Sequence, residues 1–283
     1  MSITFYPNYI HLAGFDAAVE PSITTQGYTR SDGETSGAVF DLVDNCNNTL
    51  VTIDTNAETT NFNIDLDLSA NITAADFAII DNHNFETASC DFYVKYGGTT
   101  QALTAAYSGI LGTELTSETL SANLVIEATD GICLCDFNGT RTSQNWEFVC
   151  SYNDVQFTAD VTAGEIGIGV SFSPSKNPDR VIRYDANYGT VLNESRSGAR
   201  HGIKTHGLRR GWTLSWADLT ASDIASLLTI FGVTNGRAYP FWIDLGEGTN
   251  YPLLYYVRFA SNLRYEKQTT GVYTASISFE EEI

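Results

Sequence analysis

The tetrapeptide at residues 81–84 is the first place in the sequence where side chains of catalytic type gather. Asp81, Asn82, His83 and Asn84 follow an apolar run, and general acid–base chemistry uses an imidazole beside a carboxylate. Such chemistry also needs a nucleophile or a second titratable partner, and the chain has no G-x-S-x-G motif. Asn and Asp favour turns, because their side chains bond nearby backbone. We therefore interpret DNHN as a turn between two strands and assign no catalytic residue.

The five cysteines offer no metal or disulfide framework. Cys133 and Cys135 form a C-x-C pair on one face of an expected strand, whereas a zinc site needs a second close pair. An odd number of cysteines in a long chain does not suit a disulfide scaffold. No phosphate-binding glycine loop, dinucleotide fingerprint or H-E-x-x-H motif occurs. We expect free buried thiols, no metal, no cofactor and no enzyme. A glycan-cleaving enzyme would need two carboxylates about 5–10 Å apart in a cleft, and no two are marked as such a pair.

One basic cluster lies in an acidic chain of net charge −19. Residues 1–165 contain three strong bases against 23 acids, whereas RSGARHGIKTHGLRR (196–210) contains five bases and no acid. The five are Arg196, Arg200, Lys204, Arg209 and Arg210. Opposite charges on two surfaces favour their association, so we interpret the cluster as a subunit interface. A solvated hairpin and a nucleic-acid contact remain alternatives, although no recognition helix or sequence-specific nucleic-acid motif is present.

Alternating apolar and polar residues predict strands along most of the chain. The clearest alternations are at 62–68, 146–152, 155–161, 166–172, 212–216 and 273–279. One helix is expected at 220–231, because Thr220 and Asp223 form a capping-box-like start and Gly232 follows as a stop. Ile224, Leu227, Leu228 and Phe231 would form its apolar stripe.

These elements predict an all-β protein of two β-sandwich or β-barrel domains, the second with one packed α-helix. We place the boundary near SFSPSKNPDR (171–180), where two prolines coincide with the change in charge. Residues 1–170 would form an acidic sandwich of jelly-roll type, and 171–283 a barrel-like or sandwich domain. Alternatively, residues 1–30 pair with the second domain. We expect Trp212, Trp216, Phe241 and Trp242 to form a core behind the basic cluster.

The order of elements in the last third carries a family resemblance. A strand at GWTLSW (211–216) precedes the helix within 219–231, GRAYPFWI (236–243), YYVRF (255–259) and YTASISFEEE (273–282). This order resembles the C-terminal region of tail structural proteins of long-tailed bacteriophages, in the distal-tail, baseplate and minor-tail group. The resemblance implies a β-barrel or sandwich, flanked by a helix, that builds a ring of six copies around the tail lumen. We therefore expect a virion tail protein, made in the host cytoplasm, whose partners are itself and other tail proteins.

A second likeness concerns FAIIDNHNFETASCDFYVKY (77–96). It resembles the strand, short H-N turn and alternating strand of phage virion proteins that carry a jelly-roll or galactose-binding-like sandwich. Here Asn82 replaces the commoner glycine before the histidine. The alternative function is a carbohydrate-binding module that recognises a host surface glycan, with Tyr93, Tyr107 and Tyr152 stacking on sugar rings. No run of about eighteen apolar residues occurs, so we expect no membrane span.

Overall fold

The computed structural model places the chain in two compact units. Its described residues are 3–10, 22–24, 28–30, 42–43, 50–53, 55, 61–67, 74–85, 91–97, 103–108, 113–115, 131–143, 145–151, 157, 159–179, 183–194, 200–247 and 253–282. The N-terminal unit consists of Tyr6–Phe172 and Gly248–Leu254. The C-terminal unit consists of Met1–Phe5, Ser173–Glu247 and Tyr255–Ile283, so the first residues belong with the second half of the chain.

The N-terminal unit is built from three antiparallel sheets. Their strands are β2 (Ser22–Thr24), β3 (Tyr28–Arg30), β4 (Val51–Ile53), β5 (Asn61–Asp67), β6 (Ala75–Ile80), β7 (Asp91–Gly97), β8 (Leu103–Ser108), β9 (Thr113–Leu115), β10 (Cys133–Arg141), β11 (Asn145–Ser151), β12 (Val161–Ala163) and β13 (Ile166–Gly169). One sheet has the order β2-β5-β11-β7-β8-β9, a second β10-β6-β13 and a third β12-β4-β3. Side chains from all three sheets meet in one buried core.

The alternation in the sequence selects the residues that enter this core. Phe62, Ile64 and Leu66 of β5 are buried, as predicted from their period of two. Trp146 on β11 stacks against Phe137 on β10, with ring centroids 5.5 Å apart, and so joins two sheets. The strand predicted at 155–161 is wrong in extent, because β12 begins at Val161. Before it, the carbonyls of residues 159 and 160 accept hydrogen bonds from side chains instead of from a strand.

The C-terminal unit contains a seven-stranded sheet in the order β1-β16-β17-β19-β15-β14, with β18 also paired to β19. The strands are β1 (Thr4–Tyr6), β14 (Arg183–Glu194), β15 (Arg200–Leu219), β16 (Phe241–Asp244), β17 (Leu254–Phe259), β18 (Arg264–Thr269) and β19 (Val272–Glu281). This order ends at β1 and β14, so the described strands form an open sheet where a barrel-like or sandwich domain was expected. The all-β class, with a helix in the second half, is confirmed.

Aromatic side chains form the core of this sheet. Trp212, Trp216, Phe241 and Trp242 are each at most 2% exposed, which confirms the predicted core. The rings of Phe241, Phe259 and Phe279 pack within 6 Å of one another. Phe5 of β1 packs on Phe241 and Phe279, so the first strand of the chain helps to fill this core.

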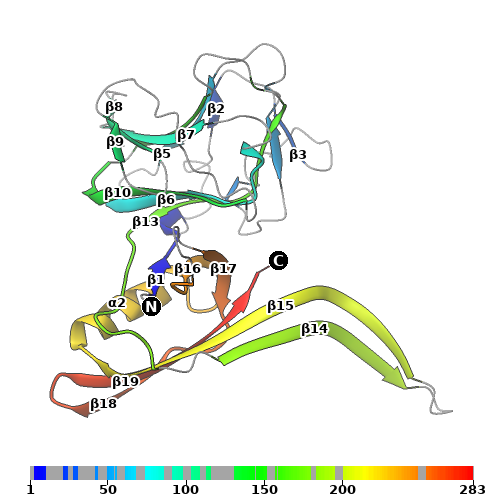
Figure 1. Ribbon diagram of the computed structural model, residues 1–283, viewed down its shortest axis with the longest axis vertical. Helices are drawn as coiled ribbons and strands as arrows, with labels where there is room; N and C mark the ends of the chain where they lie inside the picture. Colours follow the sequence, from blue (N-terminus) through cyan, green and yellow to red (C-terminus); the bar gives the residue numbers. More distant parts are fainter. Residues whose placement is uncertain are drawn as a thin grey trace. The chain divides into compact units, whose positions relative to one another are not determined.

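Helix α2 (Ala221–Val233) covers part of the sheet (Figure 1). Thr220 and Asp223 form the predicted capping box, and the Phe231 ring packs edge-on against Phe259 at 5.2 Å. Two details of the prediction are wrong. Leu228 is 43% exposed, and the buried stripe instead continues through Ile230. The helix also runs beyond Gly232, which lies in its last turn.

The helix ends where a left-handed backbone becomes available. Thr234 is its C-cap, and Asn235 and Gly236 follow with φ of 47° and 70°. The Gly236 amide donates to the Phe231 carbonyl at 2.7 Å, which satisfies a carbonyl that the last turn leaves open. The predicted stop was therefore assigned to the wrong glycine. Gly232 directly follows the apolar stripe, but only the later glycine has the left-handed backbone that closes the helix end.

Asp223 does more than cap the helix, because it also holds the segment that enters the C-terminal unit. Its carboxylate accepts the Ser175 amide at 2.9 Å and the Ser175 hydroxyl at 2.6 Å. Burial opposes ionisation of this carboxyl, but the hydrogen bonds from Ser175 and Thr220 outweigh it and lower the Asp223 pKa. Nearby, the Trp216 indole donates to the Lys176 carbonyl. The segment before β14 is thus fastened to the helix start and to β15.

We predict that Asp223→Ala lowers the free energy of unfolding of this unit by roughly 1–2 kcal/mol, because it removes a helix cap together with the acceptor for Ser175. Urea unfolding followed by tryptophan fluorescence measures this, since three of the four tryptophans lie in this unit. Asp218→Ala, at an exposed position of β15, is the matched control. Equal midpoints for the two variants would show that Asp223 has no anchoring role.

Candidate functional site

The long hairpin of β14 and β15 carries the predicted basic cluster. The two strands are paired from Arg183 opposite Thr213 to Glu194 opposite Arg200. β15 also pairs with β19, but this second pairing extends from Leu219 only as far as Gly211. Residues 200–210 therefore pair with β14 alone among the described strands. We call residues 186–194 and 200–210 the arm, which Figure 1 shows as paired green and yellow strands.

The arm is a two-stranded ribbon with an irregularity along its length. Tyr188 lies opposite Leu208, whereas the next matched pair is Thr190 with Lys204. Between these two pairs β15 therefore contains more residues than β14. Extra residues on one strand form a bulge, and a bulge increases the local twist. An isolated two-stranded ribbon is at best marginally stable in water, because it has no sheet face to bury. The stability of the arm therefore depends on the contacts at its base and on any surface that packs against it.

The base of the arm is a fork between three strands. At Gly211 β15 lies opposite Glu280 of β19, and one residue further along β19 Glu281 pairs with Val257 of β17. At Phe279 and Glu280 β19 pairs with both β15 and β17, and at Glu281 it pairs with β17 but no longer with β15. The Arg210 amide would be the next donor, and the Glu281 side chain accepts it at 3.0 Å. A carboxylate therefore replaces the missing strand partner at this position.

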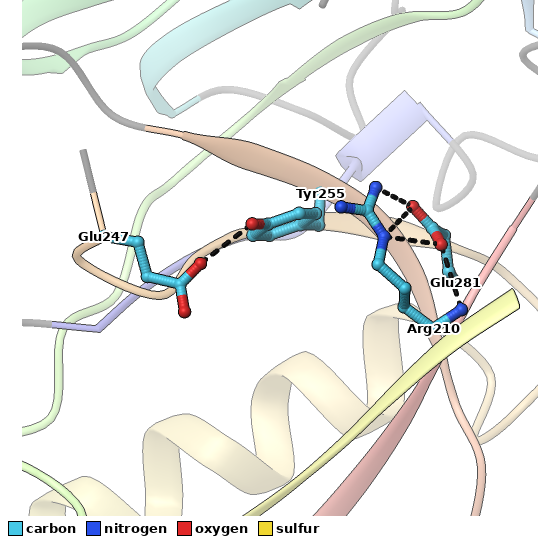
Figure 2. A network of polar contacts seen from close by, with 4 residues as sticks. All are labelled: Arg210, Glu247, Tyr255 and Glu281. Atoms are coloured by element: carbon cyan, nitrogen blue, oxygen red, sulfur yellow. Dashed lines mark hydrogen bonds and ion pairs between the residues drawn. The ribbon is translucent and has the colours of Figure 1, made fainter. Parts of the chain in front are cut away.

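The same carboxylate also binds the Arg210 side chain (Figure 2). Arg210 Nε lies 2.9 Å from both carboxylate oxygens of Glu281, and Nη2 donates to Oε1 as well. The guanidinium carbon lies 4.7 Å from the centroid of the Tyr255 ring and 5.8 Å from that of Trp212. Arg210 is therefore held by an ion pair on one side and by aromatic faces on another, an arrangement suited to a planar guanidinium.

Glu247 forms a second contact at the base. Its carboxylate accepts the Tyr255 hydroxyl at 2.8 Å and the Tyr184 hydroxyl at 2.5 Å. Tyr184 lies on β14 opposite Trp212, so Glu247 connects the first strand of the hairpin to β17. The hydrogen bond to Glu247 raises the pKa of Tyr184 to about 12, and burial, followed by Glu247, raises that of Tyr255. Both phenols therefore remain protonated donors at neutral pH.

Two of the five predicted interface residues have partners inside the chain. Arg210 binds Glu281, and Arg209 Nη1 lies 3.6 Å from Glu280 Oε1. Arg200 and Lys204 lie on β15 opposite Glu194 and Thr190 of β14, and Arg196 lies outside the described residues. The partners Glu247, Glu280 and Glu281 were not among the residues predicted from the sequence. One sequence feature could have pointed to the last two of them. The FEEE run at 279–282 groups three acids in the half of the chain that holds most of the bases.

His83 lies in a turn that leaves β6, as predicted, and the next strand, β7, belongs to another sheet. Its Nδ1 accepts the Phe85 amide at 3.2 Å, and its ring stacks on Phe85 at 4.1 Å. Asn84 fixes the turn by donating to the Asp160 carbonyl and accepting the Thr162 amide. His83 Nε2 is buried with no hydrogen-bond partner among the described residues, and burial lowers the His83 pKa to about 4. The neutral imidazole is thus an acceptor that closes a turn.

The remaining residues singled out in the sequence are three tyrosines and two cysteines. Tyr93 and Tyr107 lie on neighbouring strands β7 and β8, whereas Tyr152 lies outside the described residues. Cys133 and Cys135 lie on β10, opposite Ile80 and Ala78 of β6. In the described part of the chain, no three His, Cys, Asp or Glu residues are grouped so that they could hold a metal ion. No helix described there has the length and apolar character needed to cross a membrane.

Comparison with known proteins gives little further information. No protein-family model and no curated protein matches the chain. One similar solved structure is titled CpGH89CBM32-6 and was produced by Clostridium perfringens. It shares 13% sequence identity, and the match covers 55% of this chain and 96% of that one with a TM-score of 0.35. The arm and its base therefore have to be interpreted from their own chemistry.

We predict that His83 makes the N-terminal unit less stable as the pH falls from 6.5 to 4. In that window the unfolded histidine gains a proton while the folded one stays neutral, which costs up to roughly 3 kcal/mol. His83→Asn keeps an acceptor for the Phe85 amide and removes the titration. Urea unfolding at several pH values should therefore show a shallower pH dependence in this variant.

His201→Asn, the same substitution on the arm, serves as the control and should leave the pH dependence of the N-terminal unit unchanged. A third variant, His83→Ala, separates the turn contact from the titration. It should be destabilised at pH 7 as well, by about 1 kcal/mol, because the Phe85 amide loses its acceptor. Identical pH profiles for the wild type and His83→Asn would contradict this account.

Proposed function

We propose that the protein is a structural subunit that assembles through its arm, forming a ring in the tail of a bacteriophage. The observation that carries this proposal is the arm itself, a paired ribbon that extends beyond the β15–β19 ladder with no third strand among those described. A ribbon of this kind gains stability when a further surface covers it. Contact with the next copy would supply that surface.

The composition of the chain supports a second copy as the partner. Residues 196–210 hold five bases and no acid, whereas residues 1–165 hold 23 acids. Two of the bases, Arg209 and Arg210, pair with Glu280 and Glu281, so we assign the docking role to the other three bases of the cluster, Arg196, Arg200 and Lys204. An arm that binds a different surface on the next subunit makes a heterologous contact, and such contacts close into rings when the rotation permits.

The aromatic and apolar exposure of the hairpin also favours an interface. Four large hydrophobic side chains are markedly exposed in the described residues, and two of them lie on this hairpin. Tyr184 is 58% exposed and Leu208 is 41% exposed. The resemblance of residues 211–282 to phage tail proteins supplies the setting, a ring of six copies at the tail tip, baseplate or tube. Other tail proteins would be the remaining partners.

The test is self-association of the purified chain, measured by sedimentation velocity. We expect oligomers at about 0.05 M salt that weaken at about 0.5 M, because opposite charges are screened. The double variant Arg200→Glu with Lys204→Glu should associate at least tenfold more weakly. The control is Arg264→Glu with Lys267→Glu, which makes the same charge change on the exposed strand β18.

A wild-type chain that remains monomeric at every salt concentration would contradict self-assembly. Equal weakening by the control pair would contradict the arm as the docking element, since only net charge would then matter. The alternative function, recognition of a host glycan by the N-terminal unit, is tested on a glycan array with the same protein. Glycan binding at about micromolar strength by a chain that stays monomeric would favour that alternative.

A further inference from the structure

The fork at the base of the arm has contacts that a simple hairpin extension does not require. An antiparallel ladder can end with its last donor facing water. Here Glu281 instead binds both the amide and the guanidinium of Arg210, immediately before Gly211. Glu247 links Tyr184 of β14 with Tyr255 of β17. Both strands of the hairpin are therefore fastened by side chains at the level where the sheet ends.

We propose that Arg210, Glu281, Glu247 and the phenols of Tyr184 and Tyr255 form a latch that prevents the fork from opening into the sheet. The latch is a conformational device of the free chain, so it stands whether or not the arm joins subunits. When it is closed, β15 stays paired with β19 from Gly211 onward. When it opens, the pairs at Gly211 and Trp212 are the first to separate, and the arm lengthens at the expense of the sheet.

The two halves of the latch act on different strands and by different chemistry. The Arg210–Glu281 half is an ion pair with a half-exposed guanidinium, so salt weakens it. The Glu247 half consists of hydrogen bonds from neutral phenols to a carboxylate, which salt affects less. Tyr255 belongs to both halves, because its hydroxyl binds Glu247 while its ring faces Arg210. Loss of either carboxylate should therefore loosen the other half in part.

Hydrogen exchange of the full-length chain at neutral pH, read by mass spectrometry, tests the latch. We expect Glu281→Ala to raise exchange at least fivefold in peptides covering residues 208–216, with Glu247→Ala giving a smaller rise there and in residues 183–186. Peptides from α2 should exchange as in the wild type, which separates fork opening from general unfolding. The control is Glu266→Ala, which removes an exposed carboxylate from β18.

Limited digestion with trypsin gives a second readout, because the enzyme must accommodate an arginine side chain in extended backbone. Cleavage after Arg209 and Arg210 should accelerate in Glu281→Ala, while cleavage after Arg264 and Lys267 stays unchanged. Unchanged exchange in 208–216 together with unchanged cleavage after Arg210 would overturn the latch. Because both readouts use the free chain, failure of the latch leaves the assembly measurements untouched, and failure of assembly leaves the latch intact.

Discussion

Strand β15 has two neighbours along one part of its length and one neighbour along the rest, and the C-terminal unit depends on where this change occurs. From Leu219 to Gly211 it pairs with β19, and from Thr213 onward with β14 as well; this part carries Trp212, Leu214 and Trp216 into an aromatic core. Beyond Gly211 it has β14 alone among the described strands. Backbone pairing continues across this point, and Leu208 and Arg210, just beyond it, have exposed side chains. The buried core of the sheet therefore stabilises the unit.

The side chains at the change of pairing follow from this constraint. The pairing of β19 with β15 ends at Glu280, one residue before its pairing with β17 ends, which would leave the Arg210 amide without a strand acceptor. The Glu281 carboxylate provides that acceptor and at the same time neutralises the guanidinium. The basic segment therefore has two parts with different environments. Arg209 and Arg210 belong to the base, whereas we propose that the other three bases dock on a partner.

Much of the fold is predictable from the sequence, because alternation of apolar residues directly reports which side of a strand is buried. This holds for Phe62, Ile64 and Leu66, and a capping box likewise places the start of α2 at Thr220. The helix end was less accessible, since Gly232 and Gly236 look alike until the backbone shows which one adopts a left-handed conformation. The pairing of Arg210 with Glu281 joins residues 71 positions apart, and no local pattern encodes such a contact.

The central claim is that the arm of one copy docks on the acidic surface of the next. Electron cryomicroscopy of the assembled particle tests it most directly, because it shows the arm in place. We expect a closed ring in which residues 196–204 of each copy lie against acidic residues of the N-terminal unit of its neighbour. A particle in which this segment projects into solvent, or a protein that forms no ring, would contradict it.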